Sequence, residues 1–212
     1  MFTQENAAAV SRGVARWLKS GPVSVVLAAL VLAGPLMPIT GVWVRQFAHD
    51  PLSVFPALLW SSNPWVWFTS VLGVLAFGPL AERTLGSVRT LILGVTGHVV
   101  STAAVVVTAW TMSDVSHAWA HLLEHERFGG PWMWLIAVLM VASRRWPGMW
   151  RRRMLSLLVP VSLTAAAFAG TPFEVGLVAA LGWGWVMSLA GLGGPRRAPG
   201  GASHRKACRC EE

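Results

Sequence analysis

The chain has 212 residues, of which 54% are hydrophobic and only 12% are charged, and its formal net charge is +8. Soluble domains carry about 25% charged residues, so the composition excludes an ordinary soluble globular protein. It predicts instead an all-α membrane protein with several spanning helices.

Six apolar segments follow a polar N-terminal tail over 1–21. They are predicted to be spanning helices over 22–44, 64–81, 88–111, 131–143, 154–169 and 173–192. A hydrocarbon core of about 30 Å needs about 20 helical residues. The fourth segment is short, and we expect it at the centre of the bundle, where its neighbours shield it. The membrane domain therefore covers 22–192, and the Gly/Pro/Arg-rich tail over 193–212 is expected to be disordered.

The segment 45–63, between the first two spans, is half apolar and interrupted by prolines. It is too irregular to span a bilayer, and we predict that it lies at the outer surface. Asn63 and Pro64 then give the second span a capping side chain and a proline at its first position. The first span shows no small-residue cleavage site before Trp43, so we expect it to be retained as a signal anchor.

The basic residues fall on one side of this predicted topology. Only Arg45 and Arg127 lie opposite the other Lys and Arg residues. The positive-inside rule then places both termini in the cytoplasm of a plasma membrane. The charge is thus explained by topology, and we expect a lipid bilayer and no nucleic acid as the partner. The Ala/Gly/Arg-rich composition indicates a bacterial source.

The turn between the second and third spans reads FGPLAERTLGS and contains Gly78, Glu82 and Gly86 at intervals of four. Gly86 suits the left-handed residue that ends a helix, and Ser87 can cap the next one. A carboxylate at a helix C-terminus opposes the helix dipole. We therefore expect Glu82 to accept hydrogen bonds from the backbone N–H groups that open the third span, as a structural clasp between the two helices.

Small residues also recur every four positions in the sixth span, where they allow close helix packing. They are Gly176, Ala180, Gly184 and Ser188.

These features resemble the rhomboid superfamily. The clasp matches the rhomboid pattern Gly-x3-Glu-x3-Gly-Ser between the second and third spans. The small residues resemble the ridge of the rhomboid sixth span, and GGPWMWLIAVLMVASRR resembles the fourth span with its basic stop. The resemblance covers about residues 40 to 192 and implies a six-transmembrane-helix rhomboid-like bundle.

A rhomboid protease would need a Ser at the start of the fourth span and a His in the sixth, because a hydroxyl requires an adjacent base to become a nucleophile. Those positions read Pro131 and Leu181 here, and the expected oxyanion donors of the second span become Val66 and Ser70. No Ser occurs between residues 117 and 142, and no His occurs between 126 and 203. The resemblance therefore implies a catalytically inactive relative, without a cofactor, that binds transmembrane segments of client membrane proteins.

Two other hypotheses remain open. One is an intramembrane serine protease with a rearranged site that uses Ser116, Ser70 or His98. The other is a metal-responsive protein with ligands from His117, His121 and His125, which share one face if this segment is helical. A solvated amphipathic segment explains the same histidine pattern.

Overall fold

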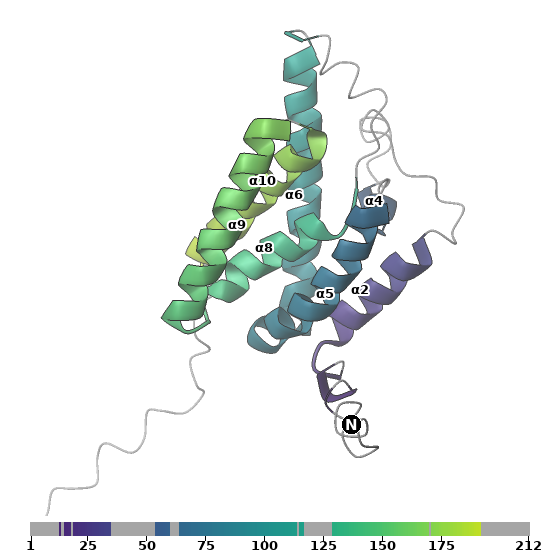
Figure 1. Ribbon diagram of the computed structural model, residues 1–212, viewed down its shortest axis with the longest axis vertical. Coiled ribbons are helices and arrows are strands. Elements are labelled where there is room, and N and C mark those ends of the chain that lie inside the picture. Colours follow the sequence, from purple (N-terminus) through teal and green to yellow (C-terminus); the bar gives the residue numbers. More distant parts are fainter. Residues whose placement is uncertain are drawn as a thin grey trace, which may run out of the picture.

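The computed structural model describes residues 13, 15–17, 19–34, 54–59, 64–113, 115–116, 129–169 and 171–191. Within these ranges the chain forms helices and turns and no strand, so the fold class of this part is all-α. The helices are α2 (Pro22–Ala33), α4 (Val54–Leu59), α5 (Pro64–Leu85), α6 (Ser87–Ser113), α8 (Trp132–Ser143), α9 (Gly148–Ala169) and α10 (Pro172–Leu189) (Figure 1).

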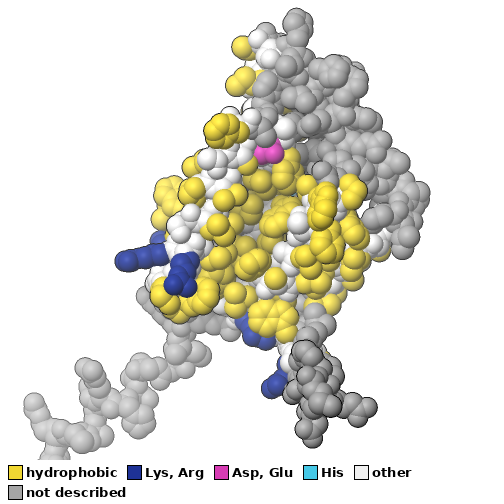
Figure 2. Space-filling model, viewed as in Figure 1, with side chains coloured by type: hydrophobic (Ala, Val, Ile, Leu, Met, Phe, Trp, Pro, Cys, Tyr) yellow, Lys and Arg dark blue, Asp and Glu magenta, His cyan; other side chains and the backbone are white. Residues whose placement is uncertain are grey.

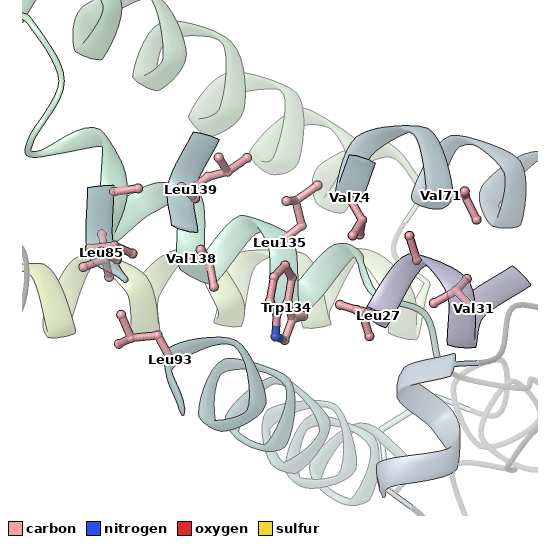
Figure 3. Close-up of a cluster of buried hydrophobic side chains, with 14 residues drawn as sticks. Leu27, Val31, Val71, Val74, Leu85, Leu93, Trp134, Leu135, Val138 and Leu139 are labelled. Carbon is pink, nitrogen blue, oxygen red and sulfur yellow. The ribbon is translucent and has the colours of Figure 1, made fainter. Parts of the chain in front are cut away.

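The short helix α8 is the centre of the fold. It has 12 residues, and every one after Trp132 is buried. It packs against α5, α6, α9 and α10. Figure 3 shows apolar side chains of α2, α5 and α6 gathered around Trp134, Leu135, Val138 and Leu139 of this helix. A helix that is apolar on all sides is typical of a protein core or of a membrane span, and here neighbouring helices bury it.

Glycines on the surrounding helices make room for the large side chains of α8. A Cβ atom added to Gly94 of α6 would lie 1.8 Å from Nε1 of Trp134, which is fully buried. A Cβ atom on Gly97 would lie 2.4 Å from Cβ of Ala137. The helix axes can therefore approach more closely than they could with any side chain at these positions.

Helix α2 pairs with α5, while α5 turns into α6 at Gly86. Gly86 has φ of 87°, the left-handed conformation that favours glycine and ends a helix. At the other side of α8, helices α9 and α10 pack against each other, and α10 also contacts α6.

The surface of the bundle is apolar where a soluble protein would be polar. Leu72 of α5, Ile92 and Val107 of α6 and Leu157 of α9 are each at least half exposed. Buried polar side chains, by contrast, include Ser70, Glu82, His98 and Ser101. Figure 2 shows extensive apolar surface on one face of the molecule. Among the described residues, two helices, α5 and α6, are long and apolar enough to cross a membrane.

The described basic side chains lie at one end of the bundle, which we call the basic end. Three places carry them: the approach to α2, the α5–α6 turn with the start of α6, and the α8–α9 turn with the first turns of α9. They are Arg16, Lys19, Arg83, Arg89, Arg144, Arg145, Arg151, Arg152 and Arg153. In Figure 2 the dark blue side chains lie in the lower part of the view, and the magenta carboxylate lies higher.

The predicted segments correspond to helices with some changed boundaries. The predicted second span, which is α5, continues to Leu85. The predicted fifth span, which is α9, begins at Gly148 rather than at 154, so Arg151, Arg152 and Arg153 belong to its first turns. The predicted fifth span over 154–169 places these arginines in the preceding loop, and the structure corrects this. Helix α4 lies inside the predicted surface loop 45–63. Residues 1–12 of the predicted tail 1–21, the predicted tail 193–212 and the second half of the first span lie outside the described residues.

Candidate functional site

The N-terminal end of α8 is where the rhomboid resemblance places a nucleophile. Gly129, Gly130 and Pro131 are all buried there. Gly130 has φ of 123°, and its N–H donates to the carbonyl of Ala57 in α4 at 2.8 Å. The approach to α8 is thus held against α4, and the residue in the nucleophile position carries only a prolyl ring.

The position that the resemblance assigns to the base also lies beside α8. Leu181 of α10 is 6% exposed and belongs to one buried apolar cluster with Met133, Ile136 and Ala137. Hydrocarbon side chains can neither accept the proton of a nucleophile nor donate to a leaving group. The side chains at these two positions therefore supply neither a nucleophile nor a base.

The remaining candidates for a rearranged protease site do not combine easily. Ser70 is buried, and its hydroxyl donates to the carbonyl of Val66 in its own helix. Ser116 lies just after the C-terminus of α6, where its N–H donates to the carbonyl of Met112. His98 lies on the same helix, 14 residues before Met112, which corresponds to about 21 Å at 1.5 Å per residue. Ser116 and His98 cannot form a nucleophile–base pair across this distance.

The predicted metal ligands His117, His121 and His125 lie outside the described residues. In the part of the chain that the structure does describe, no three His, Cys, Asp or Glu residues form a group suited to a metal ion.

The predicted clasp has a different partner from the one we expected. Glu82 is 2% exposed. Its Oε1 accepts from the backbone N–H of Val23, and its Oε2 accepts from the N–H of Ser24, both at 3.1 Å. The Ser24 hydroxyl also donates to Oε2 at 3.0 Å. Glu82 therefore binds the first turn of α2, and the expectation that it caps the helix opened by Ser87 was wrong.

The reason for this pairing lies in the sequence at the start of α2. The helix begins with Gly21 and Pro22, and Gly21 has no side chain that can cap the free N–H groups. Those groups need acceptors, and a carboxylate there also complements the positive end of the helix dipole. Gly78 permits the approach, because a Cβ atom on it would lie 2.5 Å from Oγ of Ser24. Glu82 is thus the N-terminal cap of a helix that precedes it by 58 residues.

A second set of contacts surrounds this clasp, and our sequence interpretation missed it. Nε1 of Trp17 donates to the carbonyl of Leu75 at 3.1 Å. Pro79 stands four residues after Leu75 and has no N–H, so that carbonyl lacks its normal helical donor. The guanidinium of Arg83 lies 4.5 Å from the centre of the Trp17 ring, which is a cation–π contact. A proline four residues after an apolar helical residue is the signal that could have indicated the need for a donor.

The ridge of small residues in α10 is buried along its whole length. Gly176, Ala180, Gly184 and Ser188 are all inaccessible or nearly so. A Cβ atom on Gly184 would lie 2.6 Å from Cβ of Met140 and 2.8 Å from the carbonyl oxygen of Ala137. At Gly184 this ridge therefore lies directly against α8.

Arginines of the α8–α9 turn cap other helices. A guanidinium nitrogen of Arg144 donates to the carbonyl of Ser188 near the end of α10, and one of Arg145 donates to the carbonyl of Thr84 at the end of α5. The last carbonyls of a helix have no intrahelical donor, and a cation near them also complements the dipole. These two residues, which we had interpreted only as a topology signal, also join three helices at the basic end.

The start of α10 has its own cap. Oε2 of Glu174 accepts from the backbone N–H of Thr171 at 3.1 Å and from its hydroxyl. This is the reciprocal half of a capping box, and it gives the carboxylate a structural role.

No protein-family model matches the chain, and neither a curated protein nor a solved structure matches it. The resemblance to rhomboids therefore rests on the motifs quoted above.

Proposed function

We propose that this chain is an integral membrane protein with a six-span rhomboid-like bundle and no protease activity, and that it binds transmembrane segments of client membrane proteins. Its basic end would face the cytoplasm of a bacterial plasma membrane, with both termini on that side.

The distribution of polarity supports the membrane location. Side chains such as Leu72 and Val107 are 50% and 59% exposed on helices α5 and α6. Contact with water costs about 25 cal/mol for each Å² of apolar surface, whereas contact with lipid costs nothing comparable. Buried hydroxyls instead donate to carbonyls of their own helices, as Ser70, Ser101 and Thr102 do. Such internal satisfaction is what a bilayer requires of a helix.

The collection of arginines at one end supports the proposed orientation. Cytoplasmic loops of membrane proteins carry an excess of Lys and Arg. The nine described basic residues come from three separate parts of the chain, and the contacts of Glu82, Arg144 and Arg145 bring those parts together. A single cytoplasmic face explains why all of them lie at the same end.

The arrangement of α8 supports the rhomboid-like bundle. Its 12 residues span about 18 Å at 1.5 Å per residue, well below the thickness of a hydrocarbon core. Such a helix is suited to a bilayer only when neighbouring helices surround it, as α5, α6 and α10 do here. The bilayer beside a short central element can thin, and that would favour a client helix with a short or partly polar span.

The observation that carries the absence of protease activity is the apolar character of both dyad positions. Pro131 and Leu181 are buried beside α8 and contain no group that can attack or deprotonate. In a protease whose residues act as a unit, loss of the nucleophile or its base costs about 10⁶ in turnover.

The test is co-reconstitution of the full chain with single-span substrates of an active rhomboid. The chain carries a fluorescent donor and the substrate carries an acceptor, so that energy transfer reports binding. We expect energy transfer above that of a polyleucine helix of equal length, without cleavage and without labelling by a fluorophosphonate probe. An active rhomboid in matched vesicles serves as the positive control for both reactions.

Cleavage that is lost in a Ser116→Ala or Ser70→Ala variant would overturn the proposal in favour of the rearranged protease. Energy transfer equal to that of polyleucine would overturn client binding. Metal analysis of the purified protein, compared with a variant in which His117, His121 and His125 are all Ala, tests the metal hypothesis separately. An excess of metal in the unsubstituted protein would favour it.

A further inference from the structure

An apolar cavity of about 390 Å³ lies at the basic end, between the C-terminal half of α5 and the start of α9. Its walls are Phe77 and Leu80 of α5, Trp146 and Pro147 of the α8–α9 turn, and Trp150 and Met154 of α9. Neither the proposed client binding nor the clasp at Glu82 uses this cavity.

Two arginines flank the wall that α9 contributes. Successive residues of an α-helix are about 100° apart, so Trp150 and Met154 lie about 40° from each other on one face. By the same geometry Arg151 and Arg153 lie about 80° to either side of that face, and Arg152 lies about 180° away. All three arginines are exposed. The guanidinium of Arg153 lies 5.7 Å from the centre of the Trp150 ring, which places it at the rim of the cavity.

An apolar interior with a cationic rim fits an amphiphile that has a hydrocarbon chain and an anionic head. A soluble anion would contact the arginines but leave the cavity unfilled, while a neutral apolar molecule would leave the charges without a partner. The indoles of Trp146 and Trp150 suit the boundary between headgroups and hydrocarbon. Basic pockets between helices on the cytoplasmic side are a known kind of lipid site.

We infer that the cavity between α5 and α9 binds an acyl chain of one anionic phospholipid, and that Arg151 and Arg153 bind its headgroup. This inference rests on the membrane location given under Proposed function. A lipid held here would connect the clasped pair α2–α5 with the helices beyond α8, because none of the described side chains fills this space.

The test is native mass spectrometry of the full chain, purified in detergent and incubated with dioleoyl phosphatidylglycerol or dioleoyl phosphatidylcholine. We expect preferential retention of one phosphatidylglycerol. Arg151→Gln and Arg153→Gln should each lower its affinity about fivefold, the usual contribution of one basic residue near anionic lipid. Arg152→Gln is the matched control, with the same charge change on the same helix turn, and it should leave retention unchanged.

A second variant tests the cavity itself. Leu80→Trp fills the apolar space without changing the charge, and it should reduce phosphatidylglycerol retention in protein that still elutes as a folded species. An equal loss in all three arginine variants would overturn the inference, because it would indicate only diffuse attraction to a basic surface. Equal retention of the two lipids would also overturn it.

Carbonate extraction of membranes from expressing cells separates this result from the proposed function. Protein that resists extraction but does not select phosphatidylglycerol contradicts the lipid site alone. Protein released by carbonate contradicts the membrane location as well.

Discussion

The basic end of the bundle and the N-terminal end of α8 hold their helices in different ways. At the basic end, Glu82, Arg144, Arg145 and Trp17 each bind backbone groups of another segment. At the N-terminal end of α8, the positions that could have carried polar chemistry are Pro131 and Leu181, and packing fills the space.

The difference teaches where polar side chains are useful in an apolar surrounding. A backbone N–H or C=O left without a partner in such a medium costs several kcal/mol, so helix ends that meet one another need side chains to cap them. An enzyme would need polar groups that face a substrate instead. Here the described carboxylates accept hydrogen bonds from backbone N–H groups and hydroxyls. Several of the basic residues at the helix ends contact backbone carbonyls or neighbouring side chains. The following predictions test that division.

The largest expected effect is at Glu82. Replacement by Leu removes the acceptor for the part-buried N–H of Val23 and for the buried N–H and hydroxyl of Ser24. Each buried donor left unsatisfied costs about 1–3 kcal/mol, so we expect Glu82→Leu to lower the free energy of unfolding by about 4 kcal/mol. Thermal or denaturant unfolding in detergent measures this, and Glu82→Gln, which keeps one accepting oxygen, should lose about half as much.

The cap at the other end of the molecule is the comparison for this variant. Glu174→Ala removes a capping-box carboxylate that is only partly buried, and such caps contribute about 1 kcal/mol. Equal losses for Glu82→Leu and Glu174→Ala would contradict the special role of the clasp.

The next effect concerns packing, and α10 provides a matched pair. A Cβ atom on Gly184 would lie 2.8 Å from the carbonyl oxygen of Ala137, which is backbone and cannot move away, whereas nothing lies within 4 Å of a Cβ atom on Gly182. We expect Gly184→Ala to cost about 1–3 kcal/mol through overpacking. Gly182→Ala should be neutral or stabilise by about 0.5–1 kcal/mol, because Ala favours the helix more than Gly does.

Unfolding of both variants under one condition measures the difference. A loss of stability in Gly182→Ala as large as in Gly184→Ala would mean that the ridge does not face α8.

A smaller effect is expected for the arginine caps. Arg144→Met and Arg145→Met each remove a charged donor from a helix C-terminus. A hydrogen bond to a charged group contributes about 1.5–3 kcal/mol, and we expect the lower part of that range near the surface. Arg152→Met should change the free energy of unfolding by less than about 0.5 kcal/mol, as exposed substitutions usually do. A similar loss in all three would indicate that net charge, and not capping, matters.

The sequence allowed the local elements to be predicted because their signals are local. Pro64 marks the start of α5, Gly86 its end, and the short apolar run after Pro131 corresponds to α8. The predicted start at 154 is wrong, because Arg151, Arg152 and Arg153 belong to the first turns of α9. Arginine is a good helix former, and an exposed first turn accommodates its charge.

The pairing of helices could not be predicted in the same way. The pattern at Gly78, Glu82 and Gly86 indicated a buried carboxylate that caps a helix, but two helix starts were available. The short distance along the chain favoured the helix at Ser87. However, the Ser87 side chain can cap its own helix, while Gly21 has no side chain that can do so. Asking which of these two helix starts lacks a capping side chain would have favoured α2 as the partner.

The smallest effect separates a specific backbone contact from general packing at the basic end. Trp17→Phe removes the indole N–H that donates to the carbonyl of Leu75 and keeps an aromatic ring beside Arg83. We expect a loss of about 1 kcal/mol, the usual net contribution of one hydrogen bond. In a Pro79→Ala background the new N–H of residue 79 can donate to the same carbonyl, so Trp17→Phe should then cost less. A double-mutant cycle on unfolding in detergent measures this coupling. Equal costs in the two backgrounds would mean that Trp17 stabilises the clasp through ring packing, and the contrast between a capped basic end and a packed α8 would then rest on Glu82, Arg144 and Arg145.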